Sequence, residues 1–323
     1  MEYTRLKNIN NYKSESINPA KMPDTVFEMY SVPIYETGHP EYLRGDEIAS
    51  NKAIVKKNDV LLCKINPRIN RVWVVGDESE HLNIASSEWI VIRNDQYNPE
   101  YLAWYFRTPK FQKLMTSEVT GIGGSLTRAQ PKCVAEYPVP VLDRKEQDEI
   151  VNALNKCKFI IESRKQELIK FDELIKARFV ELFGDAVANP MNWPVKKLKE
   201  LSVQINSGNT PKGGSENYVE KGITFFRSQN VWKDRLEMDD IAYIDAETHA
   251  SMKRSSLKHG DILMTKTGRI NTENSSLGRA ALYDGEDDMA NVNGHVYFIR
   301  LKDGVNNKFI LRILVSPEYR DLI

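Results

Sequence analysis

The sequence contains an internal repeat, and this restricts the possible fold more than any single motif does. Residues 55–64 match residues 257–266 at an offset of 202, with four identical positions and four conservative replacements. In each copy a turn dipeptide, Asn-Asp or Gly-Asp, precedes a short apolar run. This pattern predicts a tight turn followed by a β-strand in both places.

Two further matches lie on either side of the first and keep the same order. Residues 5–9 match residues 197–201 at an offset of 192, and residues 101–109 match residues 309–317 at an offset of 208. The offset therefore grows along the chain, as expected if loops were lengthened in the second copy. Three ordered matches predict a duplicated domain, because a fixed internal period marks a repeated structural unit.

The last of these matches is predicted to be helical in both copies. Asn98 followed by proline is a typical helix start, and Asn307 is the candidate N-cap of the second copy. The dipeptides at 108–109 and 316–317 each end in proline. Each is predicted to end one helix and begin the next, since the residue before proline avoids helical backbone angles.

A different kind of segment separates the two copies. Its apolar residues follow a heptad-like step and are Ile150, Leu154, Cys157, Ile161, Leu168, Phe171, Ile175 and Leu182. Asp143 with Glu146 forms a capping-box pattern, and Gly184 is a typical helix stop. The pattern predicts one helix about 57 Å long. We interpret it as a rigid spacer; the alternative is a bundle helix within one domain.

These observations predict an α+β fold with two similar mixed α/β domains joined by a long coiled-coil-type helix. The expected divisions are residues 1–142, a spacer helix at 143–185, and residues 186–323. Residue 323 of the second copy corresponds to residue 115 of the first, so the second domain is expected to be C-terminally incomplete. A single helix leaves its apolar seam open to water, so we also expect self-association or a partner helix.

The junction in front of the helix resembles a known family. Residues 138–142, rich in proline and valine, are followed by Glu-Gln within residues 146–151. Together with the glycine-rich residues 121–126 and the repeated Gly-Asp strand, this junction resembles the DNA-specificity subunit of type I restriction-modification systems. One proline of the family's usual pair is Val141 here. The family also normally carries a second spacer helix, which this sequence lacks.

The resemblance implies a non-catalytic protein that reads DNA. Each globular copy would be a target recognition domain for one half of a split sequence, and the helix would set the distance between the halves. The expected partners are double-stranded DNA, methyltransferase subunits and restriction/translocase subunits. S-adenosylmethionine, ATP and Mg²⁺ would be bound only by those partners. The alternative is an interaction scaffold or inhibitory half-subunit that acts through its heptad seam.

Base recognition requires forked hydrogen-bond donors, and the loops that follow the repeated strand contain them. The candidate DNA-binding residues there are Lys64, Arg68, Asn70 and Arg71 in the first copy, and Lys266, Arg269 and Asn271 in the second. Further candidates are Arg128 after the glycine-rich turn, Thr210 and Lys212 beside two glycines, and the group Arg227, Gln229 and Asn230. The alternative is that the first two loops are solvated connections and that the last group is a buried strand end.

Composition and motifs exclude several other classes. Lys+Arg and Asp+Glu both number 45, so DNA affinity must come from local basic patches rather than net charge. The sequence lacks an Asn-Pro-Pro-aromatic loop, a glycine-rich nucleotide motif and paired histidines or cysteines at metal-ligand spacing. No run of 18 apolar residues or signal peptide is present, and the three cysteines suit a reducing cytoplasm.

Overall fold

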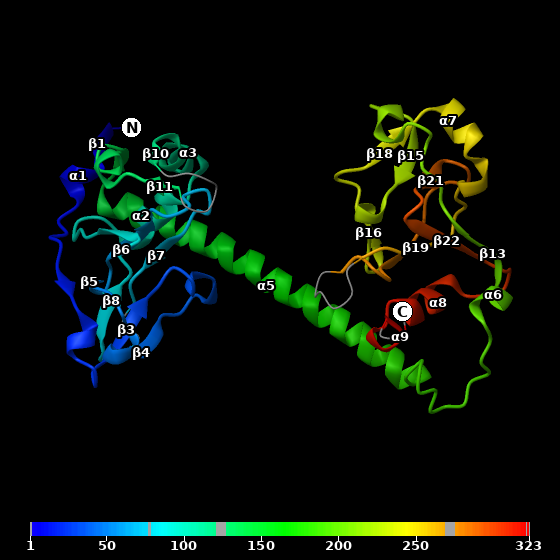
Figure 1. Ribbon diagram of the computed structural model, residues 1–323, viewed down its shortest axis with the longest axis horizontal. Helices are drawn as coiled ribbons and strands as arrows, with labels where there is room; N and C mark the ends of the chain where they lie inside the picture. Colours follow the sequence, from blue (N-terminus) through cyan, green and yellow to red (C-terminus); the bar gives the residue numbers. More distant parts are fainter. Residues whose placement is uncertain (1, 77–78, 121–126, 269–274, 321, 323) are drawn as a thin grey trace. The chain divides into compact units, whose positions relative to one another are not determined.

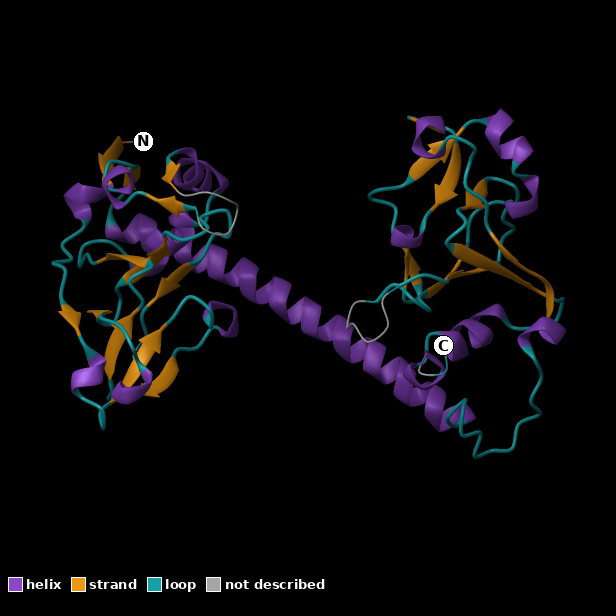
Figure 2. Cartoon of the chain, in the orientation of Figure 1, coloured by secondary structure: helices purple, strands orange, loops and turns teal. Residues whose placement is uncertain are grey.

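The computed structural model describes residues 2–76, 79–120, 127–268, 275–320 and 322. The chain divides into two compact units, Met1–Glu167 and Leu168–Ile323 (Figure 1). The long helix α5 (Arg144–Phe183) crosses the division, so its first part belongs to unit 1 and its last part to unit 2. Figure 2 shows small sheets with short helices between them in each unit.

Unit 1 contains two principal sheets. One has the strand order β2 (Ser16–Ile17), β5 (Lys52–Ile54), β8 (Leu82–Ala85), β3 (Val26–Tyr30) and β4 (Glu41–Arg44), and the other has the order β7 (Val72–Val74), β6 (Val60–Cys63) and β9 (Trp89–Ile92). Two further pairs are β1 (Glu2–Arg5) with β12 (Pro138–Val141) and β10 (Val119–Thr120) with β11 (Arg128–Ala129). The helices are α1 (Leu6–Ile9), α2 (Pro99–Phe106), α3 (Pro109–Ser117) and α4 (Pro131–Val134), with short 3-10 turns at Pro19–Lys21, Tyr35–Thr37 and Gly45–Glu47.

Unit 2 has a similar arrangement. One sheet has the order β13 (Ser202–Ser207), β22 (Val296–Leu301), β19 (Ile262–Thr265) and β20 (Ala280–Leu282), and the other has the order β14 (Tyr218–Val219), β18 (Ala242–Ile244), β15 (Ile223–Phe226) and β21 (Ala290–Val292). A hairpin joins β16 (Val231–Trp232) to β17 (Arg235–Leu236). The helices are α6 (Leu198–Leu201), α7 (Ala246–Ser251), α8 (Asn307–Leu314) and α9 (Pro317–Arg320), with 3-10 turns at Gly214–Asn217, Ser228–Asn230 and Lys253–Ser255.

The two units share their strand connectivity. Strand β6 pairs antiparallel with β7 and β9, and β19 pairs antiparallel with β20 and β22. Each unit also contains one parallel pair, β3 with β8 in unit 1 and β15 with β21 in unit 2. The predicted fold class, two similar mixed domains joined by a long helix, is therefore confirmed.

A buried ion pair explains why the turn before the repeated strand needs an aspartate. In unit 1 the Asp59 carboxylate, only 1% exposed, accepts two hydrogen bonds of 2.7 and 2.6 Å from the Arg93 guanidinium. It also accepts the backbone N–H of Lys56 at 2.8 Å, which closes the turn. These bonds hold the pKa of Arg93 above its usual value. The aspartate thus fixes the turn and links β6 to the end of β9.

Unit 2 repeats this pair. Asp261, also 1% exposed, accepts bonds of 2.9 and 2.7 Å from Arg300 and one of 2.8 Å from the backbone of Lys258. The preceding residue, Gly260, has φ +85°, and a Cβ there would lie 2.5 Å from the amide nitrogen of Asn307. Glycine suits this position because the backbone is left-handed and a Cβ would press on the Asn307 side chain; the equivalent residue of unit 1 is an asparagine, Asn58, at φ +71°.

Helix α5 begins and ends where the sequence predicts. The Asp143 side chain accepts the N–H of Glu146 at 2.8 Å, and the Glu146 carboxylate accepts the N–H of Asp143 at 3.0 Å. Gly184, at φ +77°, ends the helix. Its 40 residues give a length of about 60 Å.

The first turns of α5 are fixed to α2 within unit 1. The Gln147 side chain accepts the backbone N–H of Asn98 at 2.7 Å, and the Asn98 amide donates to Asp148 at 2.7 Å. One turn further on, Val151 is part of the hydrophobic core of unit 1. At the other end, in unit 2, the Phe179 and Phe183 rings lie 5.5 and 5.0 Å from that of Phe309 on α8.

Most of α5 is exposed along its length. Among the described residues of the helix only Gln147 and Val151 are buried. The predicted seam residues are exposed by 37% to 65%: Ile150, Leu154, Ile161, Leu168, Phe171, Ile175 and Leu182. Cys157 is exposed as well. In the described part of the chain, no helix is both long and apolar enough to cross a membrane.

The prediction for the N-cap of α8 is wrong by one residue. The side chain of Asn306, rather than that of Asn307, accepts the N–H of Phe309 at 3.0 Å. Asn307 instead donates to the carbonyl of Gly260 at 2.6 Å and so ties α8 to the turn before β19. The helix breaks at 108–109 and 316–317 are confirmed, since α3 and α9 both begin at those prolines.

Candidate nucleic-acid interface

The loop after β6 is held by the rest of unit 1 through its backbone. The N–H of Asn66, at φ +47°, donates to the carbonyl of Thr127 at 2.7 Å. The Gln112 amide on α3 donates to the carbonyls of Pro67 and Arg68, the latter at 3.0 Å. These bonds fix the loop without using its charged side chains.

Within this ordered loop Arg68 is the exposed cation. Its side chain makes no hydrogen bond or ion pair with any other described residue, whereas its carbonyl is bonded to Gln112. A guanidinium presented in this way can donate two parallel bonds to a guanine edge or to a phosphate. Arg68 is therefore the best-placed predicted reader in unit 1.

The other predicted residues of the first loop have structural contacts. Lys64 donates to the carbonyl of Ser87 at 2.6 Å, and the Asn70 amide donates to the carbonyl of Phe106 at 3.2 Å. The charge of Arg71 lowers the pKa of the buried Cys63 thiol, although burial raises that pKa overall. These three residues shape the loop, and their direct contact with DNA stays a prediction.

Arg128 is close to the first loop, but its charge is compensated. Strand β11 places its guanidinium against Glu88, with two hydrogen bonds of 3.1 Å. The carboxylate raises the pKa of Arg128. Arg128 thus neutralises Glu88 beside the loop, and it would contact DNA only by sharing that carboxylate.

In unit 2, Lys266 occupies the position of Lys64. Its ammonium donates to the Ser207 hydroxyl at 2.8 Å and lies 5.4 Å from the centre of the Tyr297 ring. The predicted readers Arg269 and Asn271 lie outside the described residues. Their role stays a prediction from the sequence match.

The structure adds one residue that the sequence analysis missed, Arg279. Its carbonyl accepts the N–H of Thr265 at 2.9 Å, just as the Arg71 carbonyl accepts the N–H of Cys63 at 3.0 Å. The two arginines therefore occupy equivalent positions at the end of the loop. The sequence does contain a signal for this equivalence. The offset between the two copies changes from 202 before the loop to 208 after it, so the second loop is six residues longer and Arg71 aligns with Arg279.

Among the remaining candidates, Asn230 was predicted to contact DNA, but its side chain is buried. It is 1% exposed, and its amide donates to the carbonyls of Glu237 and Asp240 at 3.1 and 3.0 Å. Asp240 also binds Arg227 at 3.2 Å and Gln229 at 2.5 Å. The alternative of a packed strand end holds for Asn230, because a buried amide needs its partners inside the protein.

Thr210 and Lys212 lie on an exposed turn of unit 2. Both side chains are exposed, while the carbonyl of Lys212 accepts the Asn217 amide at 2.7 Å. Gly213 follows with φ +101°, which permits the tight turn. The turn presents a threonine hydroxyl and an ammonium to solvent, which suits a phosphate contact.

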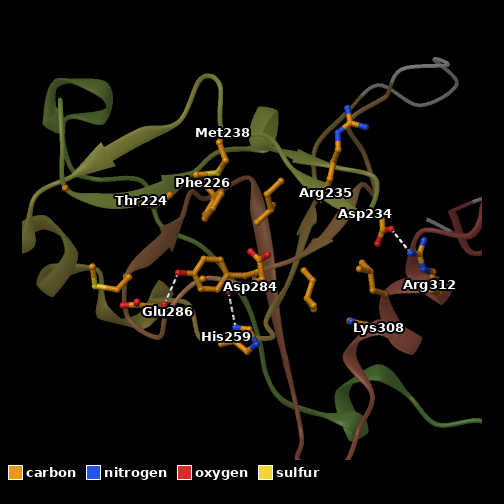
Figure 3. Close-up of a pocket in the computed structure, with 17 residues that line it drawn as sticks. Thr224, Phe226, Asp234, Arg235, Met238, His259, Asp284, Glu286, Lys308 and Arg312 are labelled. Atoms are coloured by element: carbon orange, nitrogen blue, oxygen red, sulfur yellow. Dashed lines mark hydrogen bonds and ion pairs between the residues drawn. The ribbon is translucent and has the colours of Figure 1, made fainter. Parts of the chain in front are cut away.

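Unit 2 also has a cavity of about 1080 Å³ between the β16–β17 hairpin, β20 and α8. Figure 3 shows Asp234 facing Arg312 towards one end, at 2.7 Å, and Glu286 towards the other. His259 lies between them with a ring nitrogen 3.2 Å from the carbonyl of Asp284. Among the described residues no cluster of three or more His, Cys, Asp or Glu side chains is arranged to hold a metal ion.

Solved structures share this arrangement. A chain from work described as "Structural basis underlying complex assembly and conformational transition of the type I R-M system" matches with TM-score 0.59 and 18% identity, over 99% of this chain and 81% of that one. The S subunit of the type I restriction-modification system from M. genitalium matches with TM-score 0.52 and 14% identity, over 100% and 78%. The chain has the fold of a type I S subunit. No family model and no curated protein matches the sequence.

The S-subunit fold accounts for the features described above. It combines similar globular units with a long helix, and here the helix is α5. The resemblance stated from residues 138–142 and 146–151 is thus supported at the level of the fold over nearly the whole chain.

Proposed function

We propose that this chain is a non-catalytic subunit that selects the DNA sequence on which a type I restriction-modification complex acts. The observation that carries the proposal is the duplication. In both units the central strand pairs antiparallel on both sides and is followed by a loop that begins with a lysine, Lys64 after β6 and Lys266 after β19. Two copies of one reading surface on a single chain suit a target sequence in two parts.

In this proposal each unit reads one half of the target. The loop at residues 64–71 contributes Arg68, and the loop at residues 266–279 contributes Lys266 and, from the sequence match, Arg269. Helix α5 sets the spacing between half-sites.

The exposed apolar residues of α5 suit the docking of partner subunits. Methyltransferase subunits, and restriction/translocase subunits in the larger complex, would supply S-adenosylmethionine, ATP and Mg²⁺ chemistry. A contiguous exposed apolar surface of this kind marks a protein interaction site.

The test uses the complex of the full chain with its methyltransferase partner, with methylated positions mapped by sequencing. Arg68→Ala should relax specificity in one half-site, and Arg269→Ala should do so in the other. Each loss should equal about 1–3 kcal/mol, or roughly 5- to 150-fold in discrimination. Lys13→Ala, an exposed lysine outside the loop, is the matched control. Identical methylation patterns for both arginine variants would contradict the loop assignment.

A second candidate function rests on the exposed seam of α5. A scaffold or inhibitory subunit would act through this face, and DNA would not bind specifically. Measuring DNA affinity of the complex across salt separates the two functions, because phosphate contacts weaken as salt rises. Affinity that depends neither on salt nor on sequence would favour the scaffold. Mass in solution tests self-association through the seam.

A further inference from the structure

A group of cations surrounds Trp232 on the β16–β17 hairpin of unit 2. Trp232 and Arg235 are register partners in the hairpin, so their side chains share a face. The guanidinium carbon of Arg279 lies 3.9 Å from the centre of a Trp232 ring, and that of Arg235 lies 5.4 Å from it. The indole N–H donates to the carbonyl of Gln229 at 3.1 Å. The ring is thus fixed and presents a surface on which guanidinium groups stack.

The tip of the hairpin brings Lys233 to the same place. Asp234, at φ +62°, donates its N–H to the carbonyl of Ala280 at 2.8 Å, which anchors the turn beside Arg279. The pKa of Lys233 is lowered by burial and by the nearby charges of Arg320, Lys176 and Arg279. The pKa of Arg279 is lowered by burial and by Arg320 and Arg235. Cations from the hairpin, α5 and α9 therefore repel one another.

The acidic groups around this cluster leave three of its cations uncompensated. Asp234 is paired with Arg312 at 2.7 Å, and Glu237 is paired with Arg235 at 2.5 Å. Asp172 and Glu318 line a cavity of about 200 Å³ together with Lys176 and Lys233, yet form no ion pair with them. Within the described residues, the side chains of Lys176, Lys233 and Arg320 make no hydrogen bond or ion pair. Such a cluster costs folding stability unless it binds an anion.

The position of the cluster indicates which anion it binds. Arg279 is the last residue of the segment that begins at Lys266, so the cations lie beside its described end, residues 275–279. We propose that Lys176, Lys233, Arg279 and Arg320 form a platform that binds the sugar-phosphate backbone of the DNA duplex next to the half-site read by unit 2. This inference rests on the proposed function. The platform holds unit 2 on DNA independently of sequence, since phosphate contacts position a protein and base contacts specify.

The experiment measures DNA affinity of the complex with its methyltransferase partner by fluorescence anisotropy across salt. One duplex carries the target and a second has both half-sites scrambled. The double variant Lys233→Ala with Arg320→Ala removes two surface cations. The slope of log affinity against log salt should become shallower by about 1.8, which is roughly 0.9 for each lost phosphate contact. Affinity should fall by the same factor on both duplexes, and the methylation pattern should not change.

Matched variants separate charge from structure. Lys302→Ala removes an exposed lysine of unit 2 outside the platform and should leave the slope unchanged. Lys233→Arg keeps the charge and should behave as the unmodified chain. If the unmodified complex binds its target and the double variant keeps the same slope, the platform is refuted while the proposed function stands. A larger loss on the target than on the scrambled duplex would also refute a backbone contact. Failure of the unmodified complex to distinguish the duplexes would remove both proposals.

Discussion

Units 1 and 2 share their central strand pairings but differ in what lies against the strand that follows the loop. In unit 1 the Tyr35 hydroxyl donates to the carbonyl of Val72 at 3.3 Å, and its ring lies 5.7 Å from that of Trp73. In unit 2 the equivalent carbonyl, that of Ala280, accepts from the hairpin tip at Asp234. The Val72 carbonyl also accepts a bond of 2.6 Å from Arg107. Unit 1 therefore has aromatic rings and one arginine where unit 2 has two arginines over a tryptophan.

This difference shows which parts of the duplicated unit fix the fold. The buried aspartate-arginine pair and the turn before the central strand are the same in both units. The loop after that strand differs in length and in its neighbours. The framework is thus kept in both units while the loops differ, because loops tolerate change that buried pairs do not.

The largest expected loss of stability concerns the buried aspartate-arginine pair that both units share. Asp59→Ala and Asp261→Ala each leave an arginine without its buried partner, and each should destabilise its own unit by about 3–5 kcal/mol. Urea unfolding gives the size, and hydrogen exchange shows which unit is affected. Unequal losses, with one below about 1 kcal/mol, would show that the two pairs are not equivalent.

A smaller loss of stability is expected when the N-cap of α2 or α8 is removed. Asn98→Ala and Asn306→Ala each remove an N-cap, which costs about 1 kcal/mol. Asn98 also donates to Asp148, so its loss should be larger, about 2 kcal/mol. Serine at either position keeps the cap and is the matched control. If Asn98→Ser restores full stability, the bond to Asp148 contributes nothing.

The smallest expected effect is on the pH dependence of stability, and it concerns unit 1 alone. Hydrogen bonds from Asn98 and Arg144 hold the pKa of Asp148 below its ordinary value of 3.8. A carboxylate with a lowered pKa in the folded state stabilises above its ordinary pKa, and this contribution is lost as pH falls through the lowered value. The urea midpoint of the unmodified chain should therefore fall more between about pH 4 and pH 2 than that of Asp148→Asn. Equal slopes would contradict the linkage.

The sequence predicts the elements whose signals are local. The box at Asp143 and Glu146 and the proline after Thr108 mark helix ends through neighbouring residues, and both predictions are confirmed. Asn306 and Asn307 are adjacent and chemically identical, so composition does not distinguish the cap from the residue that bonds to Gly260. Only the geometry of the helix start separates them.

Features that depend on distant residues are not predictable in this way. Asp59 is visible in the repeat, but its partner Arg93 lies 34 residues further along the chain. Asn230 has the donors of a DNA reader but is buried, and the carbonyls that its amide binds, those of Glu237 and Asp240, lie 7 and 10 residues further along the chain. Arg279 was missed since a longer loop moves it out of the first alignment.

Helix α2 limits which insertions and substitutions unit 1 can accept. Its first turn lies against Gln147 at the base of α5, and its last residue, Phe106, accepts the bond from Asn70 in the loop. One helix of eight residues thus connects the spacer to the proposed reading loop. Inserting a single residue would turn one attachment by about 100° relative to the other. Residues of this loop can therefore be exchanged without disturbing the connection to α5, whereas the length of α2 must stay constant.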